Sequence, residues 1–145
     1  MPQKLRIKFR PRPSITINRS AFRATKLVYV VRANKEFRYP WGRSRIGYIG
    51  TTKVGAGRVA TSAVAKGEEL LGRYGIKHLD LHIVTCGRLA GVETWLKLER
   101  ALIIRFRERF GRVPQANSVG KLMRWRDEKR YFSEQKLDKI IDGLG

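Results

Sequence analysis

The sequence predicts an α/β (α+β) domain: a three-stranded central antiparallel sheet flanked by helices, in the order β-β-α-β-α-α. Three observations support this fold class. Two apolar runs rich in β-branched and aromatic residues, at 27–31 and 46–50, suit paired strands. Alternation of apolar and polar residues at 77–85 suits a third strand. Apolar residues at helical spacing from 92 to 110 predict a long amphipathic helix.

Length and charge bound the organisation of the chain and its partner. With 145 residues, it is about the size of one domain and can bury a core without disulfides. It carries 32 Lys and Arg against 12 Asp and Glu, a formal charge of +20. This excess favours a polyanionic partner, most simply nucleic acid, bound in a salt-sensitive way. Composition alone supports packaging or ribosome assembly equally well, so motifs must decide.

The single cysteine, Cys86, excludes an internal disulfide and has no second cysteine with which to form a zinc site. We therefore expect a small buried residue in a reducing cytosol. No run approaches the roughly 18 apolar residues of a membrane span. The basic N-terminus is not followed by the apolar stretch of a secretion signal. These features predict a soluble, cytoplasmic protein without membrane association.

Three segments are expected along the chain. Residues 1–24 form a basic arm in which prolines disfavour a helix, leaving room for one edge strand, with a disordered tail as the alternative. Residues 25–130 form the main domain. Residues 131–145 form a C-terminal helix packed on that domain, with aliphatic side chains at helical spacing facing inward.

The first strand, at 27–31, is apolar on both faces, as expected of a central strand. Polar residues, proline and glycine at 34–44 predict a long loop, after which 46–50 returns as the antiparallel partner. Each strand carries one tyrosine, Tyr29 or Tyr48. A lone strand tyrosine usually packs in the core with its hydroxyl at the edge. One in each strand of a hairpin lets the two hydroxyls converge on one cleft.

A glycine-rich turn and then a helix of small residues, at 56–72, follow the second strand. Lys53 lies in the turn and Arg58 in the first helical turn, where free amide groups and the helix dipole favour an anion. The dipole disfavours an arginine at this end unless a phosphate binds beside it. A solvated surface charge is the alternative reading.

The third strand, at 77–85, places His78, Asp80 and His82 on one face. Successive side chains on that face lie roughly 7 Å apart, which is awkward for three ligands of one metal ion. We therefore interpret these residues as a polar sheet face and not as a metal site.

The long helix at 92–110 contains the most informative residue. Its apolar stripe, continued at helical spacing, passes through position 99 between Leu96 and Leu102, and that residue is Glu99. A carboxylate in an apolar stripe is costly unless it is paired or bound to a metal. An ion pair with one of the many arginines and a metal ligand in an active site both remain open.

Gly111 is expected to end this helix, and Pro114 to block its continuation. Asn117 then lies in a turn and can cap a further helix at 119–129. A last helix is expected at 133–141.

This ordered set of residues resembles the GIY-YIG nuclease family. Leu-Val-Tyr at 27–29 corresponds to the first family tripeptide, and Tyr-Ile-Gly at 48–50 to the second. Arg58 follows in the first helix, as the family's third element usually does. Glu99 looks like the metal-binding glutamate that the family places on a helix after the third strand. Asn117 resembles the downstream asparagine.

The resemblance covers roughly residues 27–117 and departs from the family pattern in three places. Leu27 replaces the glycine of the first tripeptide. Ser62 stands where several members carry histidine or tyrosine. Asn117 lies 18 residues after Glu99, a longer interval than the family leads us to expect.

The resemblance implies an endonuclease of duplex or branched DNA that depends on Mg²⁺ or Mn²⁺ and acts as a monomer or homodimer. Glu99 would hold the metal, and Arg58 would bind the scissile phosphate bidentately. Tyr29 or Tyr48 would position or deprotonate the attacking water. A phenol with a pKa of about 10 needs nearby positive charge to act as a base. Lys53 is an alternative base or an electrostatic helper.

Ser62 and Asn117 would contact the substrate. The alternative to an enzyme is a non-catalytic basic protein that binds DNA or ribosomal RNA. In that case Glu99 pairs with an arginine, and Tyr29 and Tyr48 only pack.

Overall fold

The computed structural model describes residues 4–8, 11–12, 25–53, 56–73 and 75–145, except for the side chains at 56–60, 62–64 and 73. The elements in chain order are β1 (Leu27–Tyr39), β2 (Gly42–Thr52), α1 (Ala56–Arg73), β3 (Leu79–Val84), α2 (Thr94–Phe110), the short 3-10 helix η2 (Glu128–Arg130) and α3 (Glu134–Leu144). The predicted α+β class is confirmed, with a three-stranded antiparallel sheet and α-helices in the order β-β-α-β-α-α across the described residues.

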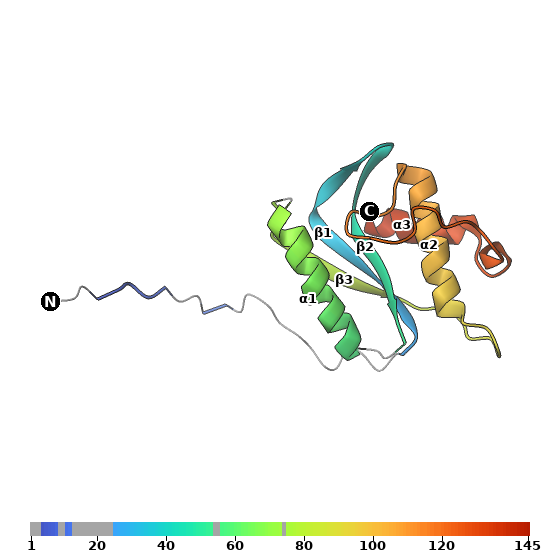
Figure 1. Cartoon of the computed structure of the whole chain (residues 1–145), viewed down its shortest axis with the longest axis horizontal. Helices are drawn as coiled ribbons and strands as arrows, with labels where there is room; N and C mark the ends of the chain where they lie inside the picture. The colour runs from blue at the N-terminus through green and yellow to red at the C-terminus, as the bar shows by residue number, and fades with distance from the viewer. Residues whose placement is uncertain (1–3, 9–10, 13–24, 54–55, 74) are drawn as a thin grey trace.

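The sheet has the order β2-β1-β3, so β1 is central and pairs antiparallel with both neighbours. Its apolar run is fully buried, as expected of a strand covered on both faces. Helix α1 lies to one side of the sheet, and α2 and α3 lie to the other (Figure 1). Strand β3 is half-buried along its whole length, which suits an edge strand.

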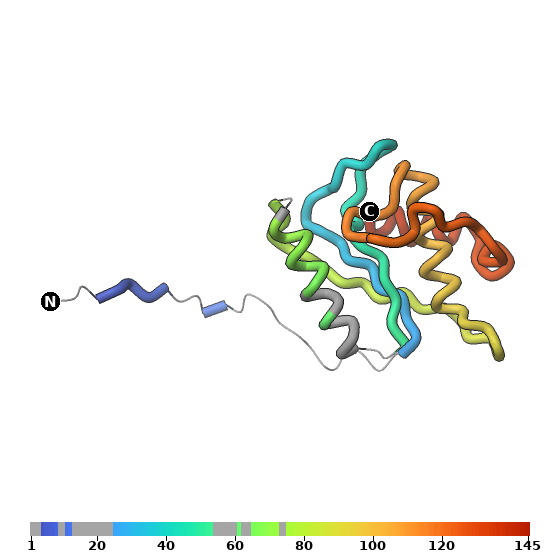
Figure 2. Tube along the Cα trace, viewed as in Figure 1, coloured from blue at the N-terminus to red at the C-terminus, as the bar shows by residue number. Residues whose placement is uncertain are grey.

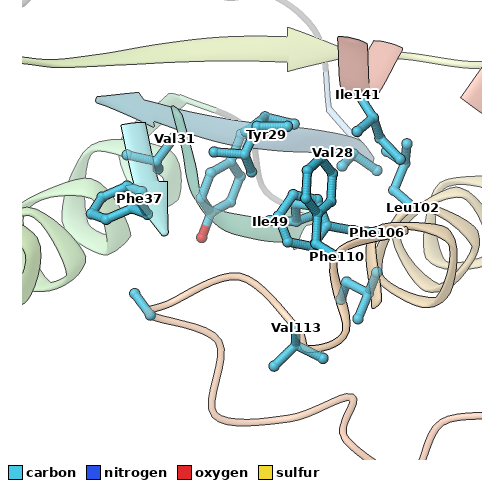
Figure 3. Close-up of a cluster of buried hydrophobic side chains, with 14 of the residues drawn as sticks. Val28, Tyr29, Val31, Phe37, Ile49, Leu102, Phe106, Phe110, Val113 and Ile141 are labelled. Carbon is cyan, nitrogen blue, oxygen red and sulfur yellow. The ribbon is translucent and has the colours of Figure 1, made fainter. Parts of the chain in front are cut away.

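The core lies between the sheet and α2, where aromatic rings from β1 and α2 meet (Figure 3). Phe106 stacks on Phe110 with ring centroids 4.5 Å apart, and Tyr39 packs edge-on against Phe106 at 5.0 Å. Aliphatic side chains such as Ile49 and Leu102 fill the space around these rings. This packing fixes α2 against β1 and β2, the two strands that carry the tyrosine pair.

The predicted long loop at 34–44 is wrong, because the two strands continue through it to a tight turn in which Tyr39 pairs with Gly42. Phe37 and Tyr39 point into the core while their charged neighbours are exposed, which is the alternation of a strand. The Tyr39 hydroxyl also donates a hydrogen bond to the Ile46 carbonyl at 2.6 Å. The charged residues of this segment face solvent and do not interrupt the strands.

The predicted helix at 119–129 is also wrong. Residues 119–127 form no helix, and the remaining two residues of the predicted span, 128 and 129, belong to the short η2. Gly120 has a φ of 105°, and Arg107 of α2 donates hydrogen bonds to the carbonyls of Gly120, Lys121 and Met123. The arginine therefore satisfies carbonyl groups that a helix would otherwise pair internally.

Helix bounds elsewhere agree with the sequence to within a few residues. Helix α2 begins at Thr94 and not at 92, because Val92 pairs with Leu89 in an isolated bridge. Gly111 ends it in the left-handed region with a φ of 84°, as expected of a C-terminal glycine. Cys86, expected to be buried, is half-buried.

The C-terminal helix α3 packs on α2 through ion pairs as well as apolar contacts. Arg105 binds Asp138 with both Nε and Nη2, at 2.8 and 2.9 Å, and Arg109 reaches Asp142 at 2.5 Å. The Ser133 hydroxyl caps the helix by accepting a hydrogen bond from the Lys136 amide. These contacts hold α3 against α2.

Most of the predicted basic arm, and most of the apolar pieces proposed for its edge strand, lie outside the described residues. Residues 4–8 and 11–12 are described and belong to no strand. Within the described part of the chain, no helix has the length and apolar character needed to cross a membrane.

Candidate active site

Tyr29 of β1 and Tyr48 of β2 pack against each other, with ring centroids 5.8 Å apart and planes inclined by 41°. The two strand tyrosines therefore lie in contact, and a cleft shared by their hydroxyls stays a prediction. Tyr29 is only 2% exposed, whereas Tyr48 is half-buried. Burial, followed by the charge and hydrogen bonding of Tyr29 and the charge of Glu99, raises the pKa of Tyr48. The phenol of Tyr48 is therefore protonated near neutral pH.

Position 50, the last of the Tyr-Ile-Gly tripeptide, has room only for glycine. It lies opposite Tyr29 in the β1–β2 ladder. A Cβ at this position would lie 2.6 Å from Tyr29 Cζ and 2.6 Å from Tyr48 Cε1. These distances are far below van der Waals contact, so any side chain at position 50 would displace both rings.

Glu99 of α2 is a half-buried carboxylate close enough to Tyr48 to influence its titration. Burial raises the pKa of Glu99 to about 7, although the charge of Arg100 opposes this shift. Within the described part of the chain, no basic side chain forms an ion pair with Glu99. Arg100, its neighbour in sequence, instead binds Glu128, with Nε 2.7 Å from Oε1. No structural ion pair for Glu99 is found among the described side chains, which do not include the Arg58 guanidinium.

Lys66 of α1 is a residue of this region that sequence reasoning missed. Its Nζ lies 5.0 Å from the centre of the Tyr48 ring and donates a hydrogen bond to the Ala116 carbonyl at 2.9 Å. Lys66 follows Arg58 by eight residues, a spacing that places the two positions about 80° apart around a helix and so within one broad face. That spacing is the signal from which it could have been found.

The backbone of Arg58 lies in the first turn of α1, as predicted, and that of Ser62 lies in the second. The side chains of both residues lie outside the described part of the structure, so their roles stay predictions. Lys53 is exposed just after β2, and its backbone carbonyl accepts a hydrogen bond from the Lys26 amide at 3.3 Å.

Asn117 holds the free edge of β2 beside Tyr48. Its Oδ1 accepts a hydrogen bond from the Ile49 amide at 3.0 Å, and its Nδ2 donates one to the Ile49 carbonyl at 2.9 Å. The neighbouring Ala116 amide donates to the Gly47 carbonyl at 2.8 Å. Asn117 is therefore a positioning residue in this geometry, and its direct contact with substrate stays a prediction.

The carboxylates and imidazoles of the described residues do not form a complete metal site. Among the described residues, no three His, Cys, Asp or Glu side chains come together as a ligand cluster. His78 and Asp80 bind each other at 2.8 Å on the exposed sheet face. Mg²⁺ in phosphoryl-transfer sites is commonly held by one or two carboxylates together with substrate phosphate and water. The half-buried carboxylate of Glu99 fits that kind of incomplete site.

A groove of about 550 Å³ lies along another face of α2, lined by Glu93, Lys97 and Arg100 among others, and Glu99 does not line it. Lys97 and Arg100 are neutralised there by Asp127 and Glu128, at 2.6 and 2.7 Å. Lys97 and Arg100 are therefore not free to bind an ionic ligand in this groove.

No family model, no curated protein and no solved structure matches this chain.

Proposed function

We propose that this protein is a divalent-metal-dependent endonuclease that hydrolyses phosphodiester bonds in DNA, built on a small domain similar to that of GIY-YIG nucleases. The observation that carries the proposal is Glu99. It is a half-buried carboxylate without an ion pair among the described residues, placed within electrostatic range of the Tyr29–Tyr48 pair. Retaining such a group costs stability, which is the pattern expected of a residue kept for chemistry.

Glu99 is the residue that would hold Mg²⁺ or Mn²⁺. The cation supplies neutralisation of charge on the phosphoryl and leaving oxygens when bound. Because burial raises the pKa of Glu99 to about 7, its carboxyl is roughly half protonated at neutral pH in the free protein. Glu99 would bind a cation in its ionised form, so its carboxyl proton would pass to solvent.

Tyr48 would orient the attacking water. Its raised pKa keeps the hydroxyl protonated, so it both donates and accepts hydrogen bonds. Tyr29 fixes the Tyr48 ring from β1, and Lys66 fixes it from α1. Removing a proton from this phenol would need additional positive charge, for which Arg58 and Lys53 are the candidates in sequence.

Arg58 would bind the scissile phosphate. It lies in the first turn of α1, where backbone amide groups are free of helical partners. A guanidinium binds two phosphate oxygens at once, and a phosphate at this end of the helix is favoured by the dipole. The formal charge of +20 would draw DNA to the surface around this site.

Incubation of supercoiled plasmid with Mg²⁺ and with EDTA tests the proposal. We expect nicking only with Mg²⁺, and loss of nicking in Glu99→Gln and Arg58→Ala with retention of DNA binding. Glu93→Gln is the matched control, because Glu93 is an exposed glutamate beside the same helix. Cleavage by Glu99→Gln at the wild-type rate would overturn the assignment.

The second candidate is a basic nucleic-acid-binding protein without catalysis, acting on DNA or ribosomal RNA. It is supported by the formal charge of +20, which suits binding of a polyanion without any catalytic group. Gel retardation without cleavage, in Mg²⁺ as in EDTA, is the result expected of that candidate.

A further inference from the structure

Trp41 at the β1–β2 turn is a large apolar side chain held in place yet left open to solvent. It is 70% exposed. Its amide donates a hydrogen bond to the Phe110 carbonyl at 3.1 Å, so the turn is fixed to the end of α2. Figure 2 shows this turn beside the segment that follows α2. A Cβ at Gly111 would lie 3.0 Å from the Trp41 ring, so this glycine leaves room for it.

Two arginines lie on the same hairpin, two and three residues from Trp41 in sequence. Arg38 and Arg43 are directly opposite each other in the β1–β2 ladder, and both are exposed. Like charges in a directly opposed cross-strand pair repel. Within the described part of the chain, neither arginine takes part in an ion pair, and Glu36 on the same hairpin does not pair with them. This end of the hairpin therefore carries positive charge that no described acidic side chain neutralises.

The opposite situation holds where α2 packs on α3. There Arg105 and Arg109 bind Asp138, and Arg109 also binds Asp142. Acidic residues thus pair with Arg105 and Arg109, whereas no described acidic residue pairs with Arg38 or Arg43. The contrast indicates that the hairpin charge is available to an external anion.

We propose that Trp41, with Arg38 and Arg43, is a contact site for a single-stranded segment of nucleic acid. An exposed indole offers a face on which an unpaired base can stack, and the guanidinium groups at the same end of the hairpin would bind phosphates of the same strand. In a duplex the base faces are already stacked on one another, so a ring of this kind discriminates in favour of unpaired bases.

The position of this site relative to Tyr48 defines the substrate further. Trp41 precedes Tyr48 by seven residues, which at about 3.3 Å per residue is at most about 23 Å along the strand. At 3.4 Å per nucleotide, the rise of duplex DNA, this upper bound spans no more than about seven base pairs. The distance to Tyr48 matters only if Tyr48 belongs to a nuclease site, so this part of the inference rests on the proposed function. The substrate class that it specifies is DNA that is branched or has a single-stranded end.

Binding measurements in EDTA test the site without requiring catalysis. The probes are a thymidine oligonucleotide of about 20 nucleotides and a blunt duplex of the same length. We expect the oligonucleotide to quench the tryptophan fluorescence of the wild-type protein and of Trp125→Phe, and to quench Trp41→Phe much less. Trp41→Gln should bind the oligonucleotide about tenfold more weakly and the duplex with unchanged affinity.

Charge variants provide the second measurement. Neutralising Arg38 and Arg43 together by glutamine should weaken oligonucleotide binding and reduce its salt dependence by one to two phosphate contacts. The matched control is the double variant Lys136→Gln and Lys139→Gln, which removes the same charge from exposed positions on α3 and should retain the wild-type salt dependence.

Three results would overturn this inference. They are unchanged oligonucleotide binding by Trp41→Gln, equal losses for the duplex and the single strand, and a response of Trp41 emission to anionic phospholipid vesicles but not to the oligonucleotide. Failure of the proposed nuclease is a separate result. In that case Glu99→Gln nicks plasmid with Mg²⁺, while the Trp41 dependence of oligonucleotide binding in EDTA is unaffected.

Discussion

Glu99 and Glu128 lie on two sides of α2 and have opposite electrostatic environments. Glu128 is 1% exposed and accepts hydrogen bonds from Arg100 Nε at 2.7 Å and the Arg126 amide at 2.6 Å. Burial raises the pKa of Glu128, but these hydrogen bonds outweigh it and leave the pKa below its usual range. Glu99 has no comparable donors among the described residues, and burial raises its pKa to about 7.

The difference teaches how one helix can support both structure and chemistry. Arg100 is adjacent to Glu99 in sequence, yet it binds Glu128 and the Arg124 carbonyl. On the side of α2 that faces residues 124–128, here the loop side, the buried polar groups are thus paired. On the side of α2 that faces Tyr48, here the tyrosine side, Glu99 has no such pair among the described residues and can change its partner or its protonation state. A half-buried carboxylate without a partner, such as Glu99, costs stability, and a satisfied pair such as Arg100–Glu128 offsets that cost.

The largest expected effect on stability comes from breaking the satisfied side. Glu128→Gln should lower the free energy of unfolding by about 3 kcal/mol, because it leaves Arg100 without its buried counter-charge. Urea denaturation measures this change. Glu134→Gln is the control: Glu134 pairs with Lys129 at 3.1 Å on the surface, so its loss should cost less than about 1 kcal/mol. Equal losses in the two variants would contradict the structural role of Glu128.

A somewhat smaller loss is expected from disturbing the tyrosine side through Gly50. Gly50→Ala places a methyl group 2.6 Å from both tyrosine rings and should cost about 2 kcal/mol. Gly72→Ala is the matched control, since nothing lies within 4 Å of a Cβ there, and in a helix it should gain up to about 1 kcal/mol. Thermal unfolding of both variants checks the sign. A neutral Gly50→Ala would mean that the two rings are not fixed in this contact.

Both sides of α2 were partly predictable from the sequence. The apolar stripe identified Glu99, and the two strand tyrosines were found from their place in a hairpin. Glu128 was assigned to an ordinary helix because its partner, Arg100, is 28 residues away, and no local pattern pairs them. The same long-range effect produced the error at 119–129, where Arg107 binds the loop carbonyls.

The hairpin shows the converse limit of local reasoning. Polar residues, proline and glycine at 34–44 predict a loop, but the burial of Phe37 and Tyr39 extends the strands to the Trp41 turn. Lys66 was missed because only the packing of α1 on β2 brings it to the Tyr48 ring. Periodicity therefore predicts elements, whereas partners across elements depend on packing.

The smallest expected effect has the opposite sign and is the sharpest test of the comparison. Glu99→Gln should raise the free energy of unfolding by about 1 to 2 kcal/mol at pH 8, because an amide does not have to be buried as an ion. The folded pKa of about 7 lies above the ordinary 4.5, so the contribution of Glu99 to wild-type stability is full below pH 4.5, is lost as the pH rises from about 4.5 to about 7, and changes little above that. The variant should lack that fall.

Urea denaturation of both proteins from pH 4 to pH 8 measures this difference. At pH 4, where Glu99 is protonated in both the folded and the unfolded chain, the two curves should coincide. Glu128→Gln should show the reverse trend, because a depressed pKa gives stability that is lost as the pH falls below the usual carboxyl range. If Glu99→Gln were destabilising at pH 8, Glu99 would be a structural ion-pair partner, and the reason for assigning it to catalysis would be removed.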